Sequence, residues 1–226
     1  MTLTVHDKLT QGSDEWHDVR RGIVTASVVG KLITPKTVKP AANPESHSLT
    51  LLLAAERITG WTEPTYTSDD MWRGIEDEPI ARDWYSEHHT PVAEVGFMAE
   101  DRFGFTIGYS PDGLVGDDGL IEVKSRRSKG QVLAHIEDAV PIENMAQLQC
   151  GLLVSGRKWI DYVSWCGGLP PYVKRVEPDR KWFDEIVEAV TVFEENVGVM
   201  VRTYQRNTAG LPTTERNPIL TAELKL

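Results

Sequence analysis

Three of the ionisable side chains between residues 110 and 124 could carry out chemistry together. Asp112 lies in a run of turn-forming residues, 110–113, which predicts a tight turn that leads into a strand. Glu122 and Lys124 follow about ten positions later, two apart in a short apolar run, so their side chains share one face of a predicted strand. Two carboxylates and an ammonium group arranged in this way suit metal-assisted attack on a phosphodiester.

The cation expected for this chemistry is Mg²⁺, with Mn²⁺ as a substitute. Mg²⁺ binds oxygen ligands and usually takes one or two protein carboxylates, while water and substrate phosphate complete its coordination. The cation offsets charge on the attacked phosphate and acidifies a water molecule, which a lysine can orient or deprotonate. The spacing alone also fits a surface hairpin with an ion pair, but the apolar residues that surround Glu122 favour the nuclease interpretation.

Helical and β-prone segments surround this stretch. Apolar periodicity and turn residues predict helices at 13–22, 25–33, 48–59, 68–88 (bent at Pro79), 130–138, 141–155 and 179–202. Strands are predicted at 92–98, 102–107, 113–115, 120–124, 158–166 and 172–176, with a loop at 34–47 and no periodicity after Gln205. This order predicts one α/β domain over residues 1–226, a central mixed sheet flanked by helices.

The composition excludes several other classes of protein. The chain has 226 residues, 40% of them hydrophobic and 26% charged, which is typical of a globular domain. No apolar run is long enough to span a bilayer and the N-terminus lacks a signal-peptide pattern, so we expect a cytoplasmic protein without a membrane partner. Cys150 and Cys166 are too few for a disulfide scaffold, a four-cysteine zinc site or an iron–sulfur cluster.

The charge balance does not favour attraction of the whole molecule to DNA. The chain carries 24 basic and 34 acidic residues, a net charge of −10, and solubility accounts for most of this excess. A local basic surface can still exist, because Lys124, Arg126, Arg127 and Lys129 lie within six positions. This cluster is either a charged loop or a phosphate track beside the metal site.

The motif Asp112…Glu122-x-Lys124 resembles the signature of the PD-(D/E)XK nucleases, and within them the lambda exonuclease branch, the YqaJ-type viral recombinase nucleases. Three further segments resemble motifs of that family in type and order: 11–20 with Gly22 and 25–27, Trp72-Arg73-Gly74 with Glu78, and 145–149. Together the motifs cover residues 11–155, and their joint order is more specific than any one of them.

The resemblance implies a metal-binding role for four positions. Asp112 and Glu122 are implied to bind Mg²⁺, with the backbone carbonyl of Val123 as a third ligand. Glu78 is implied to complete the acidic cluster, directly or through water, although by itself it reads as part of a solvated acidic helix face.

Other matching positions are implied to assist the attack of water on the phosphodiester or to bind the end of the DNA strand. Lys124 would position or activate the attacking water, and Gln147 would support the lysine or the scissile strand. Arg20 and Ser27 would hold a terminal 5′ phosphate, the arginine through charge-assisted hydrogen bonds.

The function implied by the resemblance is a Mg²⁺-dependent 5′-to-3′ exonuclease on linear double-stranded DNA. It would release 5′ mononucleotides and leave a 3′ single-stranded overhang for strand-annealing recombination. The resemblance also implies a phage- or prophage-encoded homotrimeric ring that works with a single-strand annealing protein in a bacterial host. The alternatives are an endonuclease or repair nuclease of the same fold, and a non-catalytic DNA-binding module.

Overall fold

The structure, a computed structural model, describes residues 3–64 and 67–216. Its helices are α1 (Asp14–Arg20), α2 (Ala26–Val29), α3 (Pro44–Thr59), α4 (Asp69–His88), α5 (Ser128–Glu137), α6 (Ile142–Ser155) and α7 (Arg180–Thr208), with a 3₁₀ turn η1 (Gly30–Leu32). Its strands are β1 (Thr4–His6), β2 (Val24–Thr25), β3 (Ile33–Thr34), β4 (Lys39–Pro40), β5 (Val92–Ala93), β6 (Phe97–Glu100), β7 (Ile107–Tyr109), β8 (Gly113–Val115), β9 (Gly119–Ser125), β10 (Trp159–Trp165) and β11 (Tyr172–Val176).

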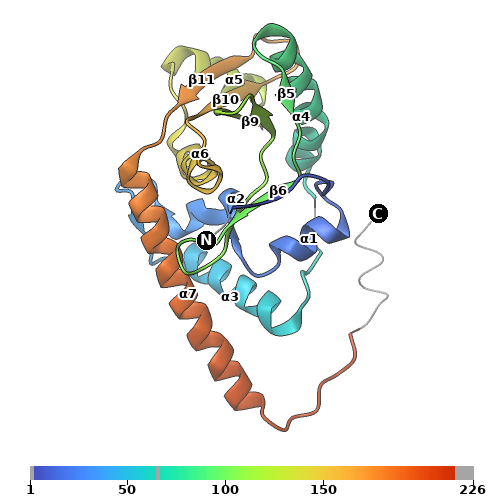
Figure 1. The fold of residues 1–226 in the computed structure, drawn as a ribbon, viewed down its shortest axis with the longest axis vertical. Coiled ribbons are helices and arrows are strands. Elements are labelled where there is room, and N and C mark those ends of the chain that lie inside the picture. Colours follow the sequence, from blue (N-terminus) through green and yellow to red (C-terminus); the bar gives the residue numbers. More distant parts are fainter. Residues whose placement is uncertain (1–2, 65–66, 217–226) are drawn as a thin grey trace.

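A five-stranded mixed sheet with the order β11-β10-β9-β8-β5 forms the upper part of the molecule (Figure 1). Strands β9 and β10 are parallel, whereas the other neighbours in this sheet are antiparallel. The predicted mixed sheet flanked by helices is therefore confirmed. A separate four-stranded sheet, β1-β6-β7-β2, and the β3–β4 hairpin are additions that the sequence analysis did not contain.

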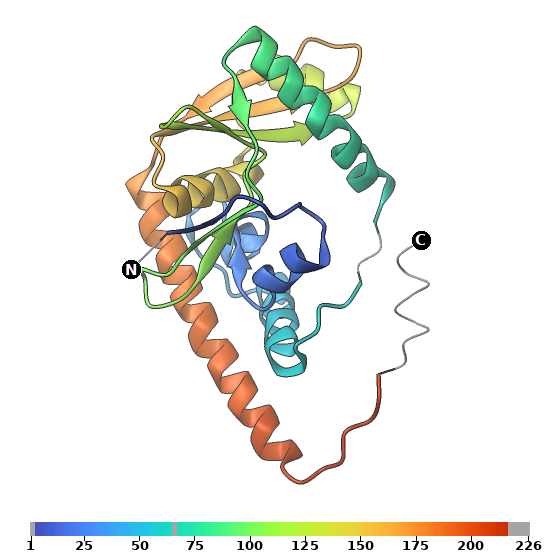
Figure 2. The ribbon, with the colours of Figure 1, turned by 45° about the vertical axis from the view of Figure 1, so that its right-hand side comes forward.

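Helix α4 crosses one face of the five-stranded sheet, as Figure 2 shows. Ala81 and Tyr85 of α4 form a small core with Ile121 and Val123 of β9, together with Val115 and Val163. Because side chains alternate along a strand, Leu120 and the residues in phase with it point to the opposite face, towards α6. Apart from Ser125, which hydrogen-bonds to Arg73 and Asp77 of α4, strand β9 is therefore apolar towards α4 and carries its ionisable residues on the other face.

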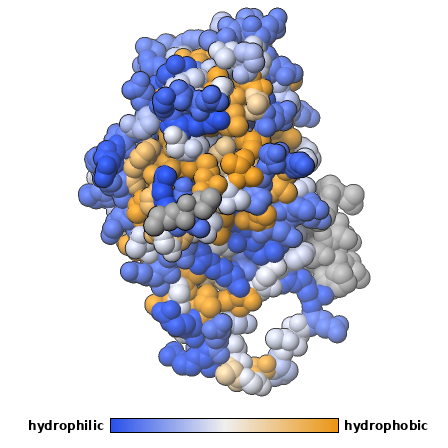
Figure 3. Space-filling model, in the orientation of Figure 1, coloured by the Kyte–Doolittle hydropathy of each residue, from blue (hydrophilic) through white to orange (hydrophobic). Residues whose placement is uncertain are grey.

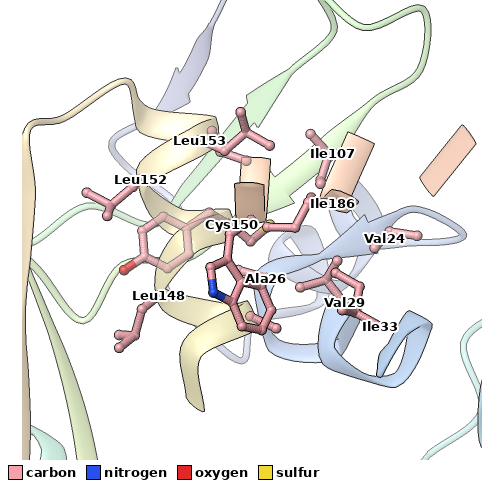
Figure 4. Packing of buried hydrophobic residues seen from close by; sticks show 14 of the residues in the cluster. Val24, Ala26, Val29, Ile33, Ile107, Leu148, Cys150, Leu152, Leu153 and Ile186 are labelled. Atoms are coloured by element: carbon pink, nitrogen blue, oxygen red, sulfur yellow. The ribbon is translucent and has the colours of Figure 1, made fainter. Parts of the chain in front are cut away.

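Helix α6 lies in the centre of the larger core. Figure 4 shows Leu148, Cys150, Leu152 and Leu153 of α6 beside residues of α2, β2 and β7, with Ile186 of α7 nearby. Both cysteines are buried and free. On the surface, apolar side chains gather across the middle of one face, between hydrophilic ends (Figure 3).

Several predicted helix ends are confirmed by their capping contacts. The side chains of Ser13 and Ser68 accept hydrogen bonds from the backbone at the starts of α1 and α4. Gly60 and Gly156 end α3 and α6 in the left-handed conformation. None of the helices in the described residues is long and apolar enough to cross a membrane.

Two predicted segments are wrong in the N-terminal half. The loop expected at 34–47 contains part of the β3–β4 hairpin, and its last four residues open α3, because Asn43 caps that helix and Pro44 occupies its first turn. The helix expected at 25–33 divides into α2, η1 and the start of β3. Pro79 lies inside α4 without ending it.

Three further boundaries differ in the second half. The strand expected at 92–98 divides into β5 and β6, which belong to different sheets, and Gly96 lies between them against the backbone of Leu9. The strand expected at 102–107 is mostly a turn, after which β7 begins at Ile107. Helix α7 continues to Thr208, beyond the last buried residue of its apolar stripe, Val197, and projects past the body (Figures 1 and 2).

Candidate active site

The turn between β7 and β8 is held against β9 by Asp112. Its Oδ2 accepts a hydrogen bond from the backbone N–H of Val123 at 2.7 Å, and its backbone carbonyl accepts one from Nε of Arg82 at 2.7 Å. The next residue, Gly113, packs so closely on Val92 that a Cβ would lie 2.1 Å from the valine Cγ1. A glycine is required here, which explains why the predicted turn has this sequence.

Glu122 lies in the middle of β9 with only 1% of its surface exposed. Its Oε1 accepts hydrogen bonds from Nζ of Lys124, at 2.8 Å, and from Nε2 of Gln147 on α6. Its Oε2 accepts one from the buried hydroxyl of Tyr109 at 3.1 Å. The structure thus brings Glu122, Lys124 and Gln147, which were all predicted from the sequence, into direct contact. Gln147 donates its hydrogen bond to the glutamate and not to the lysine.

Glu78 reaches the site from α4. Its Oε1 lies 2.5 Å from Nη2 of Arg82, one helical turn further on. Burial raises the pKa of Glu78, the charge of Arg82 opposes this shift, and the nearby carboxylate of Glu122 adds to it. Glu78 therefore belongs electrostatically to the same cluster, although α4 covers the opposite face of the sheet.

Burial and like charge dominate the electrostatics of the turn. Burial raises the pKa of Asp112 well above its usual range, and Glu122 and Glu78 raise it further. For Lys124, burial alone lowers the pKa, but the carboxylates of Glu122 and Asp112 outweigh burial, so the pKa lies above its ordinary value. The lysine is protonated at neutral pH, and the carboxylates disfavour one another's charge.

A divalent cation fits this donor set. Within residues 3–64 and 67–216, no three His, Cys, Asp or Glu side chains converge into a complete metal cluster. Mg²⁺ needs fewer protein ligands than such a cluster provides, because water and substrate oxygens complete its coordination. Asp112 and Glu122 carry hard oxygen donors whose mutual repulsion a cation would relieve.

A second polar cluster lies at the end of α1. Nη1 of Arg20 donates to Oγ of Ser110 at 2.9 Å, and Nη2 lies 3.4 Å from the hydroxyls of both Thr25 and Ser27. The guanidinium also stacks on the ring of Trp16, 3.8 Å from its centroid. Burial lowers the pKa of Arg20 to about 10, which leaves it charged at neutral pH. A cationic fork beside three hydroxyls is suited to bind a phosphate.

More than half of the chain matches a known protein family. Residues 15–158 match the YqaJ-like viral recombinase domain. The chain belongs to the YqaJ-like viral recombinase family. The matched range includes both polar clusters, and the family resemblance of the sequence motifs is confirmed.

Solved structures give the same result for the fold. This YqaJ-like chain is 31% identical to an alkaline exonuclease, LHK-Exo, from Laribacter hongkongensis, with a TM-score of 0.78 over 88% of this chain and 100% of that one. The same exonuclease in complex with dAMP gives a TM-score of 0.77 at the same identity and coverage. A phage-related exonuclease from Haemophilus somnus, 15% identical, shares the fold, with a TM-score of 0.63 over 80% of this chain and 96% of that one. No curated protein sequence matched.

Two residues that contact predicted site residues, Tyr109 and Arg82, were missed by sequence reasoning. Ser110 and Thr25 lie in the predicted motifs, but sequence reasoning assigned them no role as partners of Arg20. Arg82 carried a signal, since it follows Glu78 by four positions on a predicted helix. Tyr109 carried none, because only the fold brings it beneath Glu122.

The basic cluster after β9 is largely engaged in internal contacts. Nη2 of Arg126 donates to Asn144 at 2.6 Å and to the hydroxyl of Tyr162 at 3.1 Å. Arg127 pairs with Asp70 at the start of α4, at 2.7 Å. The internal contacts of Arg126 reduce its capacity as part of a phosphate track, whereas Arg127 and its partner are exposed.

Proposed function

We propose that the protein is a Mg²⁺-dependent exonuclease that degrades the 5′ strand of linear double-stranded DNA and leaves a 3′ overhang. The observation that supports this most is that one turn carries both clusters: Ser110 accepts a hydrogen bond from Arg20, and Asp112, two residues later, accepts one from the backbone N–H of Val123 in β9. The family is that of a viral recombinase domain, and the relative at 31% identity is an alkaline exonuclease solved with dAMP, a 5′ mononucleotide. The family and this relative support a DNA exonuclease.

The residues of β9 would prepare the attack. A cation bound by Asp112, Glu122 and the Val123 carbonyl, with Glu78 acting directly or through water, would neutralise the scissile phosphate and acidify a water molecule. Lys124, which contacts Glu122, would position the attacking water or accept its proton. Gln147 and Tyr109 hold the Glu122 carboxylate, which in turn holds the ammonium group.

The residues around Arg20 would recognise the strand end. A terminal 5′ phosphate carries more negative charge than an internal phosphodiester, and Arg20 with Ser27 offers it a cationic fork and a hydroxyl. Because the Arg20 cluster is fixed to the Asp112 turn through Ser110, a bound end would be held at a set distance from the metal site.

We further propose a homotrimeric ring that works with a single-strand annealing protein in the cytoplasm of a bacterial host, with a phage or prophage origin. These statements come from the family resemblance. The acidic chain, with a net charge of −10, has little general attraction to DNA, and a closed ring would retain DNA topologically.

End-labelled DNA tests the activity. A linear duplex labelled on either end, incubated with Mg²⁺, should lose the 5′ label first as a mononucleotide, and a closed circle should remain intact. Cutting of the circle would favour the alternative of an endonuclease on this fold. DNA binding without digestion in any divalent cation would favour the non-catalytic module.

A further inference from the structure

Arg82 joins parts of the candidate metal site that come from different elements. Its Nη2 lies 2.5 Å from Oε1 of Glu78, and its Nε donates to the backbone carbonyl of Asp112 at 2.7 Å. Its Nη1 lies 2.6 Å from Oε2 of Glu94, in the segment between β5 and β6. All three guanidinium nitrogens are therefore used, and they link α4 to the turn that carries Asp112.

The contacts of this guanidinium differ in exposure: those to Glu78 and Asp112 are its inner contacts, and the one to Glu94 is its outer contact. The side chain of Arg82 is 13% exposed and that of Glu78 is 28% exposed, whereas that of Glu94 is 77% exposed. An ion pair with an exposed carboxylate contributes little, because water screens it. The charge-assisted hydrogen bonds to Glu78 and to the Asp112 carbonyl are better shielded from water, and they fix the orientation of both partners. These two contacts therefore define the role of Arg82.

We propose that Arg82 is a positioning residue for the metal centre, which orients the Glu78 carboxylate and the Asp112 turn towards one cation. This inference rests on the function proposed above. Arg82 acts through its two partners and not on the reacting atoms. Without the planar fork, the Glu78 side chain regains rotational freedom and the carbonyl of Asp112 loses its donor. Loss of such an outer partner typically weakens metal affinity or activity by about 10- to 100-fold.

Mg²⁺ binding without DNA provides a test that does not depend on turnover. In calorimetric titrations, Arg82→Gln should raise the Mg²⁺ dissociation constant by about tenfold or more, and the half-saturating Mg²⁺ concentration for digestion should rise in parallel. The KM for DNA ends should stay unchanged, because the Arg20 cluster is untouched. Arg82→Lys keeps the charge but cannot make both inner contacts, so it should show a similar defect.

Glu94→Gln is the matched control, since it removes only the exposed contact of the same guanidinium and should behave as wild type. Unchanged or tighter Mg²⁺ binding in Arg82→Gln, or wild-type behaviour of Arg82→Lys, would overturn the inference. If Arg82→Gln does not fold, Arg82→Lys decides. A wild-type protein that neither binds Mg²⁺ nor digests DNA would contradict the proposed function instead.

Discussion

Nη1 of Arg20 donates a hydrogen bond to Oγ of Ser110 across 2.9 Å, although the two residues lie ninety positions apart in the chain. Nε1 of Trp16 donates to the same oxygen, also at 2.9 Å. Through this hydroxyl, the N-terminal helix is fixed to the turn that presents Asp112. The cluster proposed to bind a DNA end and the proposed metal site are therefore joined by one short connection.

Lys124→Ala should abolish cleavage while DNA binding and Mg²⁺ binding largely survive. The ammonium group contacts Glu122 and would serve the attacking water only in the reaction itself, so its loss should appear in the rate of the chemical step. We expect a fall of about 10²–10⁴ in single-turnover digestion. Near-normal turnover in this variant would remove Lys124 from the mechanism.

Asp112→Asn should weaken Mg²⁺ binding and nearly eliminate cleavage, because it removes a negative charge while its amide oxygen can still accept from the Val123 N–H. Calorimetry with Mg²⁺, followed by digestion of a linear duplex, measures both effects. Unchanged Mg²⁺ affinity together with normal digestion would refute the assignment of Asp112 as a ligand.

The same variant should change the pH dependence of stability in the absence of metal. Burial and the neighbouring carboxylates raise the pKa of Asp112, so the folded protein favours the neutral form of this side chain. The stability that this neutral form contributes is fully present below the ordinary pKa of about 4, and it is lost as pH rises through the raised pKa. Without metal at about pH 8, Asp112→Asn should therefore unfold at a higher temperature than wild type, and the difference should vanish towards pH 4. Mg²⁺ should raise the melting temperature of wild type only.

The sequence predicted the local parts of this site better than its assembly. Alternation along a strand placed Glu122 and Lys124 on one face, and turn residues placed Asp112 at the start of β8, because both rules depend on near neighbours. Tyr109 and Arg82 were not predicted as partners of these groups. Their contacts depend on how β7 and α4 pack against β9, which no local pattern encodes.

The fold shows the same division between local and long-range information. The mixed sheet and most helices follow from periodicity and capping residues such as Ser68. The division of 92–98 into two strands of different sheets depends instead on Gly96, whose missing side chain lets the backbone of Leu9 approach. That approach is a long-range contact, so the segment reads as one strand in the sequence.

Light scattering should give a stable mass near three times 25.3 kDa. The apolar area in the middle of one face (Figure 3) is the kind of surface that a subunit interface covers. The far half of α7 also projects from the body with Val199 and Tyr204 exposed. A stable mass near 25.3 kDa at working concentration would exclude the ring.

The preference for a 5′ phosphate should depend on Arg20. Its guanidinium can form two parallel charge-assisted bonds with a terminal phosphate, which distinguishes the end of a strand from its interior. Wild type should therefore digest 5′-phosphorylated ends faster than 5′-hydroxyl ends. Arg20→Ala should erase this difference and slow digestion of phosphorylated DNA by roughly ten- to hundredfold, the equivalent of ~1.5–3 kcal/mol for one charged hydrogen bond.

Arg21→Ala is the matched control for this prediction. The neighbouring guanidinium pairs with Asp18 of the same helix, and no described contact joins it to Ser110 or Ser27. This control should keep the phosphate preference, and both variants should bind Mg²⁺ as wild type does, because neither contacts Asp112 or Glu122. If wild type ignores the terminal phosphate, or Arg20→Ala keeps the full preference, Arg20 only stabilises the end of α1 and the polarity of digestion has another origin.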